Sequence, residues 1–109
     1  MNPRRGEIWW AALDPTVGSE IAKTRPCLIL TTDLVNAHRR RVVAVPLSSS
    51  STPHPPIRVP LQCQGRPAVA VVDQIRAVSK QRLRSLIGCA SAVELEAVGE
   101  ALKQILEVA

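Results

Sequence analysis

The 109-residue sequence contains no phenylalanine and no tyrosine, and Trp9 and Trp10 are its only aromatic side chains. A core must therefore be built from Val, Leu, Ile and Ala. A binding surface made of several aromatic rings, on which many single-strand binders stack bases, is excluded. Apolar residues make up 46% of the chain and charged residues 21%, as is typical of a folded chain. This length predicts one domain, residues 1–109.

Cysteines are few, odd in number and widely spaced, at Cys27, Cys63 and Cys89, with no CxxC pair. Such spacing disfavours both a disulfide framework and a zinc site, so we expect no metal and no cofactor. Cys27 and Cys89 have apolar neighbours and are predicted to be buried free thiols. The chain also lacks an apolar run long enough to span a membrane and an apolar N-terminal signal region. We therefore expect a cytoplasmic protein without a membrane partner.

Acidic residues are outnumbered, because nine Asp and Glu face fourteen Lys and Arg, giving a net charge of +5. This balance favours an acidic partner, either a nucleic acid or an acidic protein segment. Basic residues cluster at 4–5, 39–41 and 76–84. A solvated basic surface without a partner explains the same clusters, so charge indicates a class of partner and no chemistry.

The apolar segments are short and separated by turn signals, as in a small β-barrel or a strongly curled sheet. Loops are expected at 16–24 and at the Ser/Pro-rich stretch 48–56, and a turn at 64–67. Asp33 is predicted to cap one helical turn and Ser79 another that ends near Arg84. Trp9 and Trp10 should point to opposite faces of their strand. The expected strands cover residues 7–13, 26–32, 41–47, 57–61, 68–78 and 86–89.

The C-terminal segment has a different pattern. Ser91 followed by Glu94 is a capping box, in which each side chain satisfies a backbone N–H at the start of a helix. Apolar residues then recur at helical spacing, at Leu95, Val98, Leu102, Ile105 and Leu106. The predicted fold is therefore mainly β, a small barrel with a C-terminal amphipathic helix.

Five segments in order resemble the MazF/PemK family of toxin–antitoxin ribonucleases, from Arg5 nearly to the end of the chain: GEIWWAALDPTVGSE, KTRPCLIL, VVAVPLS, VVDQIRAVSKQRL and IGCASAVELEAVGEAL. The resemblance implies an SH3-like barrel of the MazF/CcdB type and a homodimer. It also implies cleavage of single-stranded RNA without a metal, to a 2′,3′-cyclic phosphate and a 5′-hydroxyl. The implied inhibitor is a cognate acidic antitoxin with a partly disordered C-terminal segment.

The resemblance places the chemistry on Arg25 and on Ser48. A guanidinium holds two phosphate oxygens and stabilises developing charge, but it is a poor base. Ser48 offers a hydroxyl to position the phosphate, although the serines that follow it offer others. Glu20, in the GSE segment, is our candidate general base. The remaining predicted RNA contacts are Ser19, Lys23, Thr24, Ser49, Arg76 and Lys80.

Other polar residues are given structural or surface roles. His38 and His54 are expected at the surface, and Asp73 and Gln74 are expected to be structural because a carboxylate repels phosphate. Two alternatives stay open at this point. One is a DNA gyrase poison of the CcdB type on the same fold, and the other is a non-catalytic basic binding module of SH3-like type.

Overall fold

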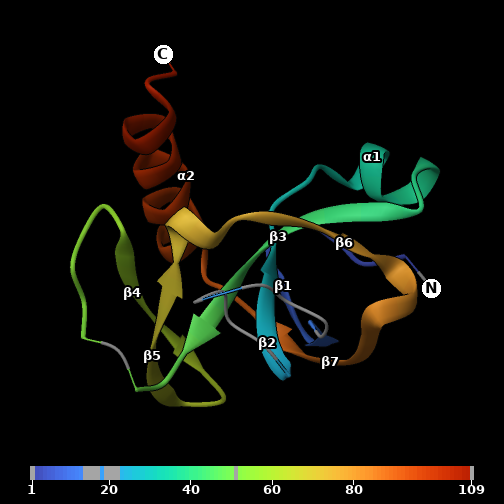
Figure 1. Ribbon diagram of the computed structural model, residues 1–109, viewed down its shortest axis with the longest axis horizontal. Helices are drawn as coiled ribbons and strands as arrows, with labels where there is room; N and C mark the ends of the chain where they lie inside the picture. The colour runs from blue at the N-terminus through green and yellow to red at the C-terminus, as the bar shows by residue number, and fades with distance from the viewer. Residues whose placement is uncertain (1, 14–17, 19–22, 51, 109) are drawn as a thin grey trace.

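A curled antiparallel sheet forms the body of the protein in the computed structural model, which describes residues 2–13, 18, 23–50 and 52–108 (Figure 1). Within them, seven strands are ordered β4-β5-β3-β2-β1-β7, and β6 also pairs with β3. The elements are β1 (Glu7–Ala12), β2 (Thr24–Ile29), α1 (Asp33–His38), β3 (Arg41–Ser48), β4 (Arg58–Cys63), β5 (Arg66–Val71), η1 (Val72–Gln74), β6 (Arg76–Ser79), η2 (Lys80–Arg82), β7 (Leu83–Cys89) and α2 (Ala92–Leu106).

β3 is the central strand and exchanges partners along its length. One edge pairs with β2, whereas the other pairs first with β6 at residues 41–44 and then with β5 at Leu47 and Ser48. The 3-10 turn η1 joins these two partners. The single strand predicted over 68–78 is therefore wrong, because the chain turns a corner at Val72–Gln74 to pass from one part of β3 to the other. This corner helps to curl the sheet.

The sheet is buried on both faces. One apolar cluster lies between the sheet and α2 and includes Ile8, Leu28 and Val98. A second cluster lies on the opposite face and includes Trp9 and Cys27. As predicted, the two tryptophans point to opposite faces, since Trp9 is in this second cluster and Trp10 is half-buried elsewhere.

The capping box at the start of α2 is confirmed. The Ser91 hydroxyl accepts a hydrogen bond from Glu94 N at 3.1 Å, and Glu94 Oε1 accepts one from Ser91 N at 2.8 Å. Val98 is fully buried and Leu95 partly so, whereas Leu106 is 57% exposed because the helix end extends beyond the core. No helix of the described part is long and apolar enough to cross a membrane.

Several local predictions need correction. Thr32, and not Asp33, is the N-cap of α1, while the Asp33 carboxylate accepts a hydrogen bond from Arg5 N at 2.7 Å. The turn between β4 and β5 contains only Gln64 and Gly65, both with positive φ, which matches a tight two-residue hairpin. Several boundaries also move, since β2 runs over residues 24–29, β4 extends to residue 63 and β7 begins at residue 83.

The cysteine prediction is half right. Cys27 is buried, at 1% exposure, but Cys89 is exposed. β7 is the last strand in the sheet order, paired with β1 along one edge. Apolar neighbours in sequence therefore do not guarantee burial in this strand.

Candidate active site

The pairing of β2 with β3 brings Arg25 and Ser48 to one groove. Cys27 lies opposite Pro46, and the register continues in steps of one residue to Ile29 opposite Ala44. Arg25 lies two residues before Cys27 in β2 and Ser48 two residues after Pro46 in β3, so both lie just beyond this paired stretch. Both residues line the same groove, which has a volume of about 260 Å³.

Arg25 is an exposed residue on a fixed stretch of backbone. It lies opposite Ala11 in the pairing of β1 with β2, and Pro26 restrains the backbone that follows it. Just before β2, the carbonyl of Lys23 accepts a hydrogen bond from Leu13 N at 2.8 Å. The pairing of β2 with β1 thus fixes the position of the Arg25 backbone.

Ser48 ends β3 and lies opposite Val69 of β5. Its hydroxyl is 3.3 Å from the Ser50 hydroxyl and accepts a hydrogen bond from Ser50 N at 3.3 Å. Ser49 lines the same groove and is exposed, outside the strand. Of the described serines, Ser48 is therefore the one held by the sheet beside Arg25.

The β4–β5 hairpin forms the opposite wall of the groove and carries a residue that sequence reasoning missed. Arg66 follows the two-residue turn and lines the groove, so a second guanidinium is available beside Arg25 and Ser48. The sequence signal was Gln64-Gly65, which favours a tight hairpin and would have put Arg66 in a strand. Trp10 also lines the groove, which gives this half-buried aromatic side chain a place at the site.

The other predicted residues are spread over a wider area. Thr24 begins β2 and Lys23 precedes it, both exposed, so they lie beside Arg25 in the chain. Arg76 is half-buried and lies opposite Ala44, midway along β3, and Lys80 follows β6 at the other end of β3. Ser19 and Glu20 lie outside the described residues.

Arg76 is close enough to the buried Cys27 for its charge to affect that thiol. Burial raises the pKa of Cys27 to about 12, and the positive charge of Arg76 acts in the opposite direction. Cys63, which lines the groove, also has a raised pKa because of burial.

His38, His54 and Asp73 are exposed. Among the described residues no three His, Cys, Asp or Glu side chains are grouped as metal ligands would be.

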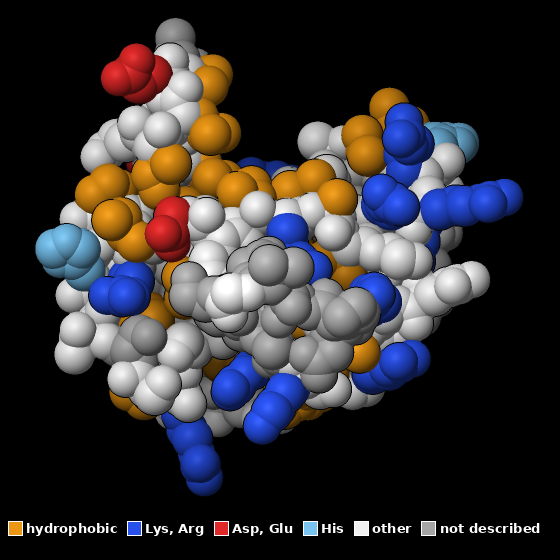
Figure 2. Space-filling view, viewed as in Figure 1, with side chains coloured by type: hydrophobic (Ala, Val, Ile, Leu, Met, Phe, Trp, Pro, Cys, Tyr) orange, Lys and Arg blue, Asp and Glu red, His pale blue; other side chains and the backbone are white. Residues whose placement is uncertain are grey.

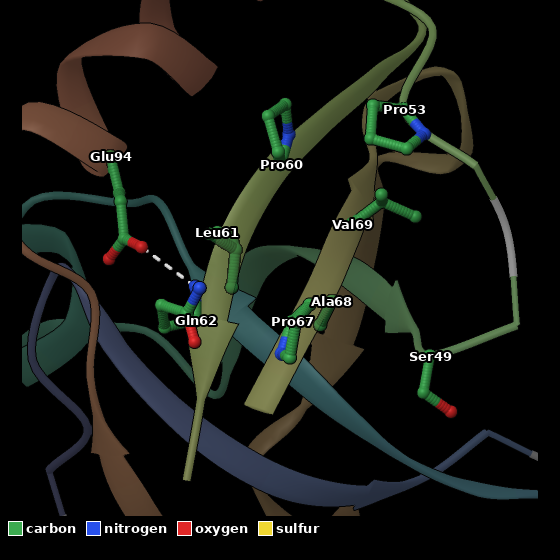
Figure 3. A pocket seen from close by; sticks show the side chains of 9 residues that line it. All are labelled: Ser49, Pro53, Pro60, Leu61, Gln62, Pro67, Ala68, Val69 and Glu94. Carbon is green, nitrogen blue, oxygen red and sulfur yellow. Dashed lines mark hydrogen bonds between the residues drawn. The ribbon is translucent and has the colours of Figure 1, made fainter. Parts of the chain in front are cut away.

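A second hollow, of about 280 Å³, adjoins the groove and shares Ser49, Pro67 and Ala68 with it. Figure 3 shows Glu94, from α2, on one side of this hollow and Ser49 on the other. Glu94 Oε2 accepts a hydrogen bond from Gln62 N at 2.7 Å (Figure 3). The two hollows together form a continuous depression, with the cationic side chains of Arg25 and Arg66 in the first and the carboxylate of Glu94 in the second.

A family model described as the PemK-like, MazF-like toxin of type II toxin–antitoxin systems matches residues 4–106. The chain belongs to this family. Endoribonuclease MazF9 of Mycobacterium tuberculosis is 36% identical over 114 residues, covering 96% of this chain and 97% of that protein. The predicted resemblance is thereby confirmed.

The fold of this MazF-like chain is also confirmed by solved structures. MazF from Deinococcus radiodurans superposes with a TM-score of 0.88 at 26% identity, over 98% of each chain. A mycobacterial endoribonuclease in complex with its cognate antitoxin has a TM-score of 0.78 at 23% identity, over 99% of this chain and 96% of that one. The mainly β architecture with a C-terminal helix is therefore that of MazF toxins.

Proposed function

We propose that this chain is an endoribonuclease toxin that cleaves single-stranded RNA, including mRNA, at specific sequences without a metal ion. The products are a 2′,3′-cyclic phosphate and a 5′-hydroxyl, and a cognate antitoxin neutralises the activity. The observation that supports this proposal is the groove in which β2 and β3 bring Arg25 and Ser48 together. Relatives with matching length are named endoribonucleases.

In the proposed reaction the 2′-oxygen of the RNA attacks the neighbouring phosphorus atom, and the bond to the 5′-oxygen of the next nucleotide breaks. Charge accumulates on the phosphate oxygens in the transition state. Arg25 supplies a fixed, permanently charged fork of donors for those oxygens, and Arg66 faces the same groove. Neither arginine is suited to remove the 2′-proton, because a guanidinium does not lose its own proton near neutral pH.

The remaining roles follow from the chemistry that is still required. The Ser48 hydroxyl orients the scissile phosphate by donating to one of its oxygens. Glu20 is proposed as the base that accepts the 2′-proton. The departing 5′-oxygen takes a proton from solvent and becomes the 5′-hydroxyl. The flanking nucleotides are proposed to contact Ser19, Lys23, Thr24, Ser49, Arg76 and Lys80.

The proposed setting is that of a type II toxin, the description carried by the matching family. We propose one domain over residues 1–109, a homodimer, and a cytoplasmic location where mRNA is available. The net charge of +5 complements both RNA and an acidic antitoxin segment.

The experiment that tests the proposal is cleavage of a long single-stranded RNA in EDTA, with mapping of the new ends. Arg25→Ala and Arg25→Lys are compared with wild type, and Ser48→Ala with Ser49→Ala. Loss of a preorganised donor to developing charge typically lowers the rate by about 100- to 1000-fold. Arg25→Lys should also be impaired, because an ammonium keeps the charge and loses the planar fork.

Arg4→Ala is the matched control, since the Arg4 side chain forms an exposed ion pair with Asp33, and such a pair is worth little. Cyclic phosphate ends from wild type and from Arg4→Ala, but not from Arg25→Ala, support the proposal. Absence of cleavage by wild type, or equal cleavage by Arg25→Ala, contradicts it. A gyrase supercoiling assay then tests the CcdB-type alternative directly.

A further inference from the structure

A second basic groove lies at the end of β3 that is far from Ser48. It has a volume of about 600 Å³ and is formed where the end of α1 and the start of β3 meet η2. Arg39, Arg40, Arg41 and Lys80 line it, together with His38. Figure 2 shows Lys and Arg side chains gathered beside α1.

The charges of this groove are available to a ligand. Arg39, Arg40 and Arg41 are exposed, and no acidic residue is among the described residues that line the groove. Lys80 Nζ donates a hydrogen bond to the neutral amide of Asn2 at 3.4 Å, which leaves its positive charge uncompensated by that contact. An anion is therefore the ligand that this groove fits.

The groove is held at a fixed separation from the candidate active site. Arg41 begins β3 and Ser48 ends it, so seven residue steps of about 3.3 Å separate them by about 23 Å. The strand is paired on both edges, with β2 on one side and β6 and β5 on the other. Arg76 lies opposite Ala44, between the two sites.

We propose that this second groove binds the phosphate backbone of the RNA substrate several nucleotides away from the scissile bond. The inference rests on the proposed ribonuclease function. An RNA molecule bound at Arg25 and Ser48 carries further phosphates. The effective concentration of these phosphates is high at a groove that β3 holds at a fixed distance from the cleavage site. Guanidinium groups are the side chains best shaped to bind phosphate oxygens. An acidic protein segment is the alternative occupant, and the test distinguishes it from RNA.

The test compares RNAs of different length on an Arg39→Gln/Arg40→Gln variant. One RNA is just long enough to fill the Arg25–Ser48 groove, and two others extend it by several nucleotides at the 5′ or the 3′ side. Binding is measured by fluorescence anisotropy with 2′-O-methyl RNA, which cannot be cleaved. Cleavage of the matching unmodified RNAs gives kcat and KM separately.

We expect the variant to bind the short RNA as wild type does and to bind one of the extended RNAs more weakly. Each phosphate contact on a single strand contributes about 0.7 to the slope of log affinity against log salt, so losing two contacts should reduce that slope by about 1.4. KM should rise for the same extended RNA, while kcat stays unchanged. Arg5→Gln/Lys103→Gln is the control, because it removes the same charge from another exposed surface.

Three outcomes would overturn the inference. The first is unchanged binding of both extended RNAs, and the second is an equal loss in the control variant, which would indicate a general effect of net charge. The third is a variant that binds every RNA as wild type does and binds only the antitoxin more weakly, which would assign the groove to an acidic protein. Because binding is measured without cleavage, a failure here differs from a failure of the ribonuclease proposal, which is judged with Arg25→Ala.

Discussion

Replacing Glu94 by alanine removes a carboxylate that joins α2 to the β4–β5 hairpin. One carboxylate oxygen accepts a hydrogen bond from Ser91 N at 2.8 Å and completes the helix cap. The other accepts one from Gln62 N in β4 at 2.7 Å. Since the same hairpin forms a wall of the Arg25–Ser48 groove, this side chain couples the helix to the site.

The loss can be estimated from these two bonds. Hydrogen bonds to charged groups contribute about 1.5–3 kcal/mol each, but Glu94 is half-buried and both backbone donors belong to exposed residues. Water can replace part of each bond, so about 1 kcal/mol apiece is appropriate, as for a typical helix cap. The expected loss of unfolding free energy is about 2 kcal/mol, or about 8 °C in Tm for a chain of this size.

Urea and thermal unfolding measure the loss, and amide hydrogen exchange at Gln62 locates it. Ser91→Ala removes the hydroxyl half of the capping box and leaves the bond to Gln62, so Glu94→Ala should cost about 1 kcal/mol more than Ser91→Ala. Glu96→Ala is the control, because Glu96 is an exposed acid on the same helix and should change stability by less than about 0.5 kcal/mol. Equal stabilities for Glu94→Ala and Glu96→Ala would refute the reasoning.

Two glycines should respond in opposite directions to alanine in urea unfolding. Gly99→Ala should stabilise α2 by about 1 kcal/mol, because a Cβ there meets nothing within 4 Å. Gly6→Ala should lower the free energy of unfolding by about 1–2 kcal/mol, because Gly6 has a φ of +91° and an added Cβ would lie 3.3 Å from the Leu95 side chain. A more stable Gly6→Ala variant would contradict this backbone conformation. In iodoacetamide labelling of the folded protein, read by mass spectrometry, exposed Cys89 should react and buried Cys27, with a pKa of about 12, should not. Early reaction of Cys27 would show that the second apolar cluster opens.

Features that join residues close together in the sequence could be predicted, whereas features that depend on strand pairing could not. The Ser91–Glu94 box joins residues three apart in sequence and was predicted with its hydrogen bonds. The break at Val72–Gln74 was missed, because apolar periodicity does not show that a strand must change partners along β3. Arg66 was missed for a similar reason, since its place at the groove follows from the register of β5 with β3.

The candidate site shows the same division. The chemistry of Arg25 follows from its guanidinium. Its role together with Ser48 was implied by the family resemblance, and the physical reason for it, the pairing of β2 with β3, is visible only in the structure. The second basic groove brings together residues 39–41 and Lys80, which belong to separate basic clusters in the sequence. The pairing of β3 with β6 joins them. Composition predicted an anionic partner and could not indicate where it would bind.

The hydrogen bond from Leu13 N to the Lys23 carbonyl separates the length of a connection from the position of an arginine. It closes the chain just before Arg25, next to the pairing of Ala12 with Thr24. Doubling the length of a connection closed in this way costs only about 0.6 kcal/mol, and the pairing of Arg25 with Ala11 is independent of that length. An insertion after Leu13 should therefore be tolerated, whereas replacing Ser19 or Glu20 would remove a group proposed to act on the RNA.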